Sequence, residues 1–151
     1  MSDETPPPPA QAPFRILPEV TEANEHFWRS GERGELAMLC CDACATWVHP
    51  PAPVCPGCLG MQLSPKALSG RARLVTFTVN HHSWIPGFDP PYVVAIVELV
   101  EQAGLRLTTN LVGVEPLRMQ ADPDAFIGMD VRVVFEARDD DIYLPLFEPV
   151  A

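Results

Sequence analysis

The tight clustering of cysteines constrains this chain more than any other feature of its sequence. All five cysteines lie in the nineteen-residue segment "CCDACATWVHPPAPVCPGC". Four of them form two C-x2-C pairs, Cys41/Cys44 and Cys55/Cys58, with ten residues between the pairs. Each pair can present two thiolates to one ion from a tight turn, and two pairs complete a tetrahedral sulfur shell. The spacing therefore predicts a metal knuckle of the ribbon or rubredoxin type.

The residues around these pairs favour a structural site. "CPGC" supplies the proline and glycine that suit a tight turn, and "HPPAPV" stiffens the connection, which lowers the entropy cost of closing the loop. Four thiolates fill the shell of one ion and leave no open position for a substrate. We therefore expect structural Zn2+ at these cysteines, with iron as the less favoured alternative. Cys40 is expected to pack as a small side chain, and His49 is a disfavoured alternative ligand.

The charge of the chain disfavours two classes of partner. Its formal net charge is −10 and Lys66 is its only lysine. From Arg71 to Pro149, six arginines stand against twelve acidic residues. Such a surface repels nucleic-acid backbones and acidic membranes, so we expect neither as a partner.

The sequence shows no sign of export or of membrane insertion. No apolar run is long enough for a transmembrane helix, and the acidic, proline-rich N-terminus lacks the basic and apolar regions of a secretory signal. These observations predict a cytoplasmic protein, in which thiols stay reduced and closely spaced cysteines bind metal.

Prolines, cysteines and hydrophobic patterning divide the chain into four predicted parts. The first part carries six prolines, which predict a disordered or extended arm. The parts are a disordered arm (1–18), an N-terminal helix (19–35), a rubredoxin-like ribbon (36–66) and a β-barrel domain (67–151).

The helix is predicted over Glu22–Ser30, and either Gly31 or Gly34 is expected to end it. Phe27 and Trp28 are neighbours in this segment. Because adjacent positions on a helix cannot share one face, we expect at least one of these aromatic rings to meet another surface.

Five short strands are predicted after the ribbon. The first alternates, with Val75, Phe77 and Val79 on one face, and the last contains Pro145, which favours an edge or a bulge. A proline-containing segment after the third strand is limited to a short helix or turn. This pattern predicts a small, partly open Greek-key barrel. The predicted strands are Arg73–Val79, Tyr92–Val100, Leu105–Val112, Val131–Ala137 and Ile142–Phe147.

An ordered set of motifs gives the chain a family resemblance. "FWRSGERGEL", "CDACATWVHPPAPVCPGC", "YVVAIVEL", "TTNLVG", "IGMDVRVVFE" and "LPLFEP" resemble, in that order, the zinc-ribbon OB-fold family catalogued as domain of unknown function 35. The resemblance runs from Glu25 to Pro149. It implies a mainly β protein with an N-terminal helix, a rubredoxin-like zinc ribbon and a five-stranded OB-fold barrel. One departure is the turn at 101–104, which indicates a slightly longer hairpin than the family's usual short acidic glycine turn.

The resemblance also implies a role in acyl-CoA metabolism. Members of the family are non-catalytic partners of thiolase-like enzymes, including steroid side-chain retro-aldolases, and sometimes of hydratases with a hot-dog fold. This chain is accordingly expected to be an acyl-CoA-binding and assembly subunit in lipid or steroid degradation, without catalytic residues of its own. In the family, the acyl-CoA pocket is expected where helix, ribbon and barrel meet.

Candidate contact residues come from the sequence itself. The loop "HHSWIPGFDPPY" interleaves aromatic residues with proline and glycine, a composition typical of binding surfaces; the alternative is that its rings cap the barrel. Two other functions remain open, a single-stranded nucleic-acid-binding module, which the acidic charge disfavours, and an iron-containing redox protein. The candidate substrate-binding or partner-binding residues are Phe27, Trp28, Arg29, Trp84 and Phe88.

Overall fold

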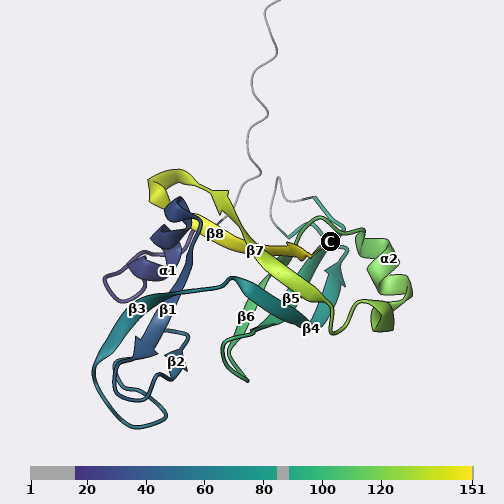
Figure 1. The fold of residues 1–151 in the computed structure, drawn as a ribbon. Coiled ribbons are helices and arrows are strands. Elements are labelled where there is room, and N and C mark those ends of the chain that lie inside the picture. The colour runs from purple at the N-terminus through teal and green to yellow at the C-terminus, as the bar shows by residue number, and fades with distance from the viewer. Residues whose placement is uncertain (1–15, 85–88, 151) are drawn as a thin grey trace, which may run out of the picture.

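The structure, a computed structural model, describes residues 16–84 and 89–150. It has the predicted mainly β architecture: a short helical segment, a three-stranded ribbon and a five-stranded barrel (Figure 1). Most of the predicted N-terminal arm lies outside the described residues. No helix in the described ranges is long and apolar enough to cross a membrane. The elements are α1 (Glu25–Arg29), η1 (Ser30–Arg33), β1 (Leu36–Cys41), β2 (Trp47–Val48), β3 (Leu63–Leu68), β4 (Arg71–Asn80), β5 (Tyr92–Leu99), β6 (Arg106–Leu111), α2 (Pro116–Ala121), η2 (Pro123–Ala125), β7 (Asp130–Ala137), η3 (Asp139–Asp141) and β8 (Tyr143–Pro149).

The N-terminal helix begins three residues later than predicted. A turn precedes it, in which the Asn24 side-chain oxygen accepts a hydrogen bond of 2.8 Å from the Thr21 backbone N–H. The Glu25 N–H then donates to the Thr21 carbonyl at 2.9 Å, so the regular helix starts at Glu25. After α1 the chain tightens into η1, and Gly34 ends it in the left-handed conformation with φ of +70°. Gly34 was one of the two predicted ends.

Gly31 lets this helical segment lie directly on the barrel. A Cβ atom at this position would stand 2.6 Å from Cδ1 of Phe135 and would also overlap the side chain of Tyr143. Phe135 and Tyr143 belong to β7 and β8. The absence of a side chain at Gly31 is therefore what allows the backbone of η1 to pack on these two strands.

The ribbon is an antiparallel sheet with strand order β2-β1-β3. Its central strand is almost fully buried, because Leu36 and Met38 of β1 belong to the same hydrophobic core as the barrel residues. Cys40 is buried in this strand, as predicted, with 3% of its surface exposed. The ribbon is thus attached to the barrel through a shared core and through the chain connection.

The barrel strands follow the order β4-β5-β6-β8-β7, and β7 returns to pair with β4. The barrel is closed, whereas the sequence predicted a partly open one. Closure comes from a short parallel contact of β6 with β8, where Leu111 pairs with Phe147 and the Val112 N–H donates to the Phe147 carbonyl at 2.8 Å. Pro145 pairs with β7 only, and its carbonyl accepts the Thr109 hydroxyl at 2.8 Å. The proline therefore occupies a position without a ladder bond to β6, although β8 is paired on both sides of the closed barrel and is not the edge strand that was predicted.

A bulge changes which side chains of β4 face the core. The pairing with β5 shifts between Leu74 and Thr76, which leaves Val75 without a paired partner. Leu74 is buried before the shift, and Phe77 and Val79 pack against the core after it. The predicted common face of Val75, Phe77 and Val79 is therefore wrong at Val75, because the extra residue of a bulge reverses the alternation.

A glutamine of the β5–β6 turn holds the ribbon against the barrel. The Gln102 side chain accepts a hydrogen bond from the Trp47 N–H at 2.8 Å and donates to the Trp47 carbonyl at 3.1 Å. The neighbouring Glu101 carboxylate accepts the Ser69 N–H at 2.6 Å, where β3 leads into β4. The turn at 101–104, which departs from the family pattern, therefore acts as a clamp: it holds both the ribbon and the connection between β3 and β4.

We expect Gln102→Ala to lower the free energy of unfolding by about 1–3 kcal/mol, since two partly buried backbone groups of Trp47 lose their partner. Amide exchange in β2 should rise more than exchange in the barrel strands. Gln62→Ala, on the exposed surface of the ribbon, is the control and should change stability by less than about 0.5 kcal/mol. Equal effects of the two variants in urea denaturation would show that the clamp contributes nothing.

Candidate functional site

The first cysteine pair lies in a tight turn at the end of β1. The Cys41 carbonyl accepts a hydrogen bond of 2.9 Å from the Ala45 N–H, and the Cys41 N–H donates to the Thr46 carbonyl at 2.9 Å. Ala45 takes a φ of +60°, which turns the chain back on itself. The turn thus brings Cys44 to the same side of the chain as Cys41.

The second cysteine pair repeats this turn. The Cys55 carbonyl accepts the Leu59 N–H at 2.9 Å, and the Cys55 N–H donates to the Gly60 carbonyl at 2.8 Å. Leu59 has a φ of +62°, matching Ala45 in the first turn. A side chain at Gly60 would crowd the sulfurs, because its Cβ would stand 3.2 Å from Sγ of Cys58. Two equivalent knuckles therefore face each other.

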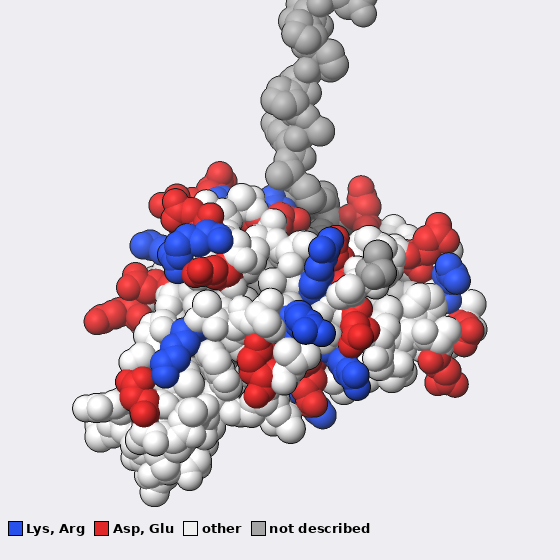
Figure 2. Space-filling view, in the orientation of Figure 1, with Lys and Arg blue, Asp and Glu red and all other residues white. Residues whose placement is uncertain are grey.

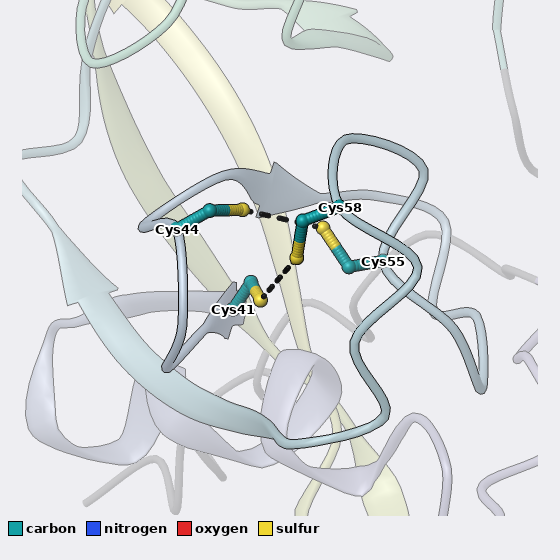
Figure 3. Close-up of side chains that lie close together, drawn as sticks. All are labelled: Cys41, Cys44, Cys55 and Cys58. Atoms are coloured by element: carbon teal, nitrogen blue, oxygen red, sulfur yellow. Dashed lines mark hydrogen bonds between the residues drawn. The ribbon is translucent and has the colours of Figure 1, made fainter.

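The four sulfurs meet between the knuckles (Figure 3). All four Sγ atoms lie within 4.8 Å of one another, and Cys41–Cys58 and Cys44–Cys55 are both separated by 3.6 Å. Tetrahedral coordination with metal–sulfur bonds of about 2.3 Å places sulfurs about 3.8 Å apart. The cluster therefore fits one four-coordinate ion, as the sequence spacing predicted.

The electrostatics of the cluster suit a cation. The Thr46 hydroxyl, 3.1 Å from Sγ of Cys44, lowers the pKa of that thiol to about 6. A backbone hydrogen bond from Gly60 acts to lower the pKa of Cys58, but the adjacent Cys44 and Cys41 sulfurs outweigh it and raise that pKa to about 12. The Cys44 and Cys58 thiols therefore do not ionise easily together, and a bound cation would stabilise four thiolates at this separation.

Sequence reasoning missed two contributors to this site. Thr46 was not singled out, although its hydroxyl contacts Cys44; a threonine two residues after a ligand is too common to have indicated this role. Gly60 follows the second pair and permits the close approach of the backbone to the sulfurs. His49, the alternative ligand, lies outside the cluster, and its ring stacks on Phe27 with centroids 4.8 Å apart.

Phe27 is a packing residue rather than a surface residue. Only 3% of its surface is exposed, and it belongs to the common core. Its ring meets Trp28 edge-on, with centroids 4.7 Å apart. A partner or acyl chain cannot reach Phe27 in this structure, so the predicted contact role of this residue is not supported by its position.

The remaining candidates do not come together in one place. Trp28 is half-buried, and Arg29 is exposed on α1 with Glu25 at 3.9 Å. Trp84 is 71% exposed, and its indole N–H donates to Asn80 at the end of β4. In Figure 1, α1 lies beside the ribbon, whereas that end of β4 lies on the opposite side of the barrel. Phe88 lies outside the described residues.

Taken together, a four-cysteine knuckle ribbon and a closed five-stranded barrel define a metal-binding ribbon protein of the OB-fold class. Family models agree: "ChsH2, rubredoxin-like zinc ribbon domain" matches residues 28–64, and "ChsH2, C-terminal OB-fold domain" matches residues 65–136. A DUF35 domain-containing scaffold protein of Methanocaldococcus jannaschii is 34% identical over 76% of this chain and 77% of its own length. The chain belongs to the DUF35 family.

Two further relatives are larger proteins. A probable enoyl-CoA hydratase alpha subunit of Thermomonospora curvata is 36% identical over 90% of this chain. The 3-oxo-4,17-pregnadiene-20-carboxyl-CoA hydratase alpha subunit of Mycobacterium tuberculosis is 34% identical over 80% of it. The chain spans only 40% and 36% of these two relatives.

Solved structures give the same assignment. A chain of the "Ltp2-ChsH2(DUF35) aldolase" matches with a TM-score of 0.76 and 34% identity, over 89% of this chain and all of that one. A DUF35 protein of unknown function from Sulfolobus solfataricus, 14% identical with a TM-score of 0.55, shares the fold.

Proposed function

We propose that this chain is a non-catalytic subunit that docks on a thiolase-like aldolase and helps to hold an acyl-CoA thioester for it. The observation that carries the proposal is the match to the DUF35 chain of the Ltp2-ChsH2 aldolase, 34% identical over that chain's whole length. The names of the hydratase alpha subunits and of the scaffold protein support the same kind of role, a subunit of an enzyme complex. A hydratase with a hot-dog fold is the second kind of partner that we propose.

The metal in this proposal is zinc. Four cysteine thiolates at tetrahedral separations are the usual shell of structural zinc, which contributes to folding without taking part in a reaction. Bound zinc would hold the two knuckles together and so fix the shape of the ribbon. Iron in the same shell would give visible absorbance, and a colourless protein with one equivalent of zinc is the result that we expect.

A polar hollow beside α1 supports contact with the phosphates of coenzyme A. It has a volume of about 510 Å³, and Arg29, Arg33 and Lys66 line it together with three glutamates. Each of these cations has a carboxylate neighbour, so a phosphate would replace an existing partner. Trp28 on α1 and Trp84 beyond β4 are the aromatic residues that we propose for acyl or partner contact.

The surface charge favours this proposal over nucleic-acid binding. On the face shown in Figure 2, acidic side chains lie among the basic ones. On the barrel, Arg73, Arg106 and Arg132 each pair with a carboxylate, at 3.3, 2.9 and 2.7 Å. A groove that follows a phosphate backbone needs unpaired cations in a row.

Co-expression with an Ltp2-like aldolase tests the proposal. We expect the two chains to purify as one complex, with carbon–carbon cleavage of a hydroxyacyl-CoA only when both are present. The separate chains, assayed at the same concentration, are the controls. Failure of the chains to associate, or cleavage by this chain alone, would contradict the proposed function.

A further inference from the structure

The ribbon carries an uncharged surface in an otherwise highly charged protein. Residues 43–65 contain no Asp, Glu, Lys or Arg, whereas 20% of the whole chain is charged. In Figure 2 the lobe that holds β2 and the knuckles is correspondingly white, with charged side chains only at its upper edge. A surface of this kind lacks the charges that keep ordinary protein surfaces apart.

Large apolar side chains project from this lobe. Leu59 and Met61 are each 76% exposed, and Val54 is 37% exposed. All three flank the second knuckle, whose turn fixes their backbone. Leu59 in particular holds a φ of +62°, a conformation that a leucine rarely adopts. The knuckle thus presents apolar side chains on a rigid support, which is what an interface anchor requires.

A groove adjoins one of these side chains, Met61. It has a volume of about 420 Å³ and lies between the turn before α1 and the ribbon. Half-buried Leu39 and Leu63 contribute apolar surface to its lining, together with Met61 and Pro51–Pro53. Glu22 contributes the one carboxylate among the described residues that line it, and His26 is the other titratable side chain there. No ion pair of Glu22 with another described residue is observed.

We propose that this groove and the exposed Leu59 and Met61 form the docking surface for the enzyme subunit, which inserts an apolar segment flanked by a lysine or arginine. The apolar lining selects apolar side chains, and the carboxylate of Glu22, which forms no ion pair with the residues that the structure describes, selects a basic neighbour. The net charge of −10 also favours a basic partner surface. This inference rests on the proposed function, because it assumes an enzyme partner, and it assigns the contact to the ribbon rather than to the barrel.

Neutral polar substitutions test the surface without adding charge beside the sulfurs. We expect the double variant Leu59→Asn, Met61→Gln to weaken binding of the Ltp2-like aldolase at least about 30-fold in calorimetry, with metal content and melting temperature unchanged. Asparagine suits the positive φ at position 59. Leu117→Asn on α2, where the leucine is 60% exposed, is the matched control and should stay within about threefold.

Reversing the charge of Glu22 is the second test of the docking surface. Glu22→Lys should weaken the same association about tenfold, with most of the change in the association rate at low salt, whereas Glu32→Lys on η1 should have little effect. Light scattering of the chain alone tests whether the lobe binds a second copy instead. Dimerisation that the double variant abolishes would overturn the assignment to an enzyme subunit.

The results of these binding measurements distinguish an error in the proposed function from an error in the proposed docking surface. If the wild-type chain fails to bind the aldolase, the proposed function fails and this inference fails with it. If the wild type binds and the ribbon variants bind equally well, or if Leu117→Asn is the damaging change, the function stands and the ribbon surface is wrong.

Discussion

Replacing Cys55 with serine is expected to abolish stoichiometric metal binding and to unfold the ribbon. Cys55 is fully buried, and its backbone makes both hydrogen bonds of the second knuckle. Structural zinc contributes about 10–16 kcal/mol of apparent binding free energy in small zinc domains, which a three-thiolate site cannot retain. We expect the melting temperature to fall by at least about 10 °C, since each kcal/mol shifts it by about 3 °C in a chain of this length.

Elemental analysis and calorimetry of Cys55→Ser measure both effects. Cys40→Ala is the matched control, because Cys40 is buried one residue from a ligand but lies outside the cluster. This control should keep one equivalent of metal. Full metal content in Cys55→Ser, or metal loss only in Cys40→Ala, would mean that the ligand set is assigned incorrectly.

Replacing Phe147 with alanine is expected to be the most damaging change in the barrel. Phe147 has no exposed surface, and it pairs with Leu111 where β6 and β8 close the barrel. Truncation of a buried phenylalanine costs about 3–5 kcal/mol, a large part of the stability of a small domain. The backbone hydrogen bond from Val112 also depends on this contact. Phe147→Ala should therefore shift the urea midpoint strongly and increase amide exchange along β6 and β8.

Val150→Ala serves as the control for Phe147→Ala. Val150 follows the same strand but is 50% exposed, so its truncation should change stability by less than about 0.5 kcal/mol. A loss below about 1 kcal/mol for Phe147→Ala would indicate that barrel closure does not depend on this side chain.

The sequence was sufficient for the features that follow from spacing and periodicity. The two C-x2-C pairs specify a knuckle ribbon because sulfur ligands must meet within a few ångströms, whatever the remaining fold. The alternation of Leu105, Leu107, Thr109 and Leu111 likewise predicted an inward face, and all four side chains are buried. Local chemistry decides these features, so one sequence is enough to predict them.

Other features depend on contacts between distant segments. The bulge at Val75 is set by the pairing of β4 with β5, and alternation within β4 alone gives no sign of it. The hydrogen bonds of Gln102 to Trp47 join positions 55 residues apart. Phe27 and Trp28 looked equivalent in sequence, yet Phe27 lies in the core because the ribbon strand β1 and the barrel together surround it. Long-range packing decides each of these outcomes.

The proposed function depends most on a ribbon that needs its metal in order to dock on an enzyme. The direct measurement is the affinity of the Ltp2-like aldolase for this chain before and after the chain alone is stripped with a chelator and desalted. We predict at least about a 100-fold loss of affinity, restored by one equivalent of Zn2+. Unchanged affinity of the metal-free chain would contradict this role of the metal.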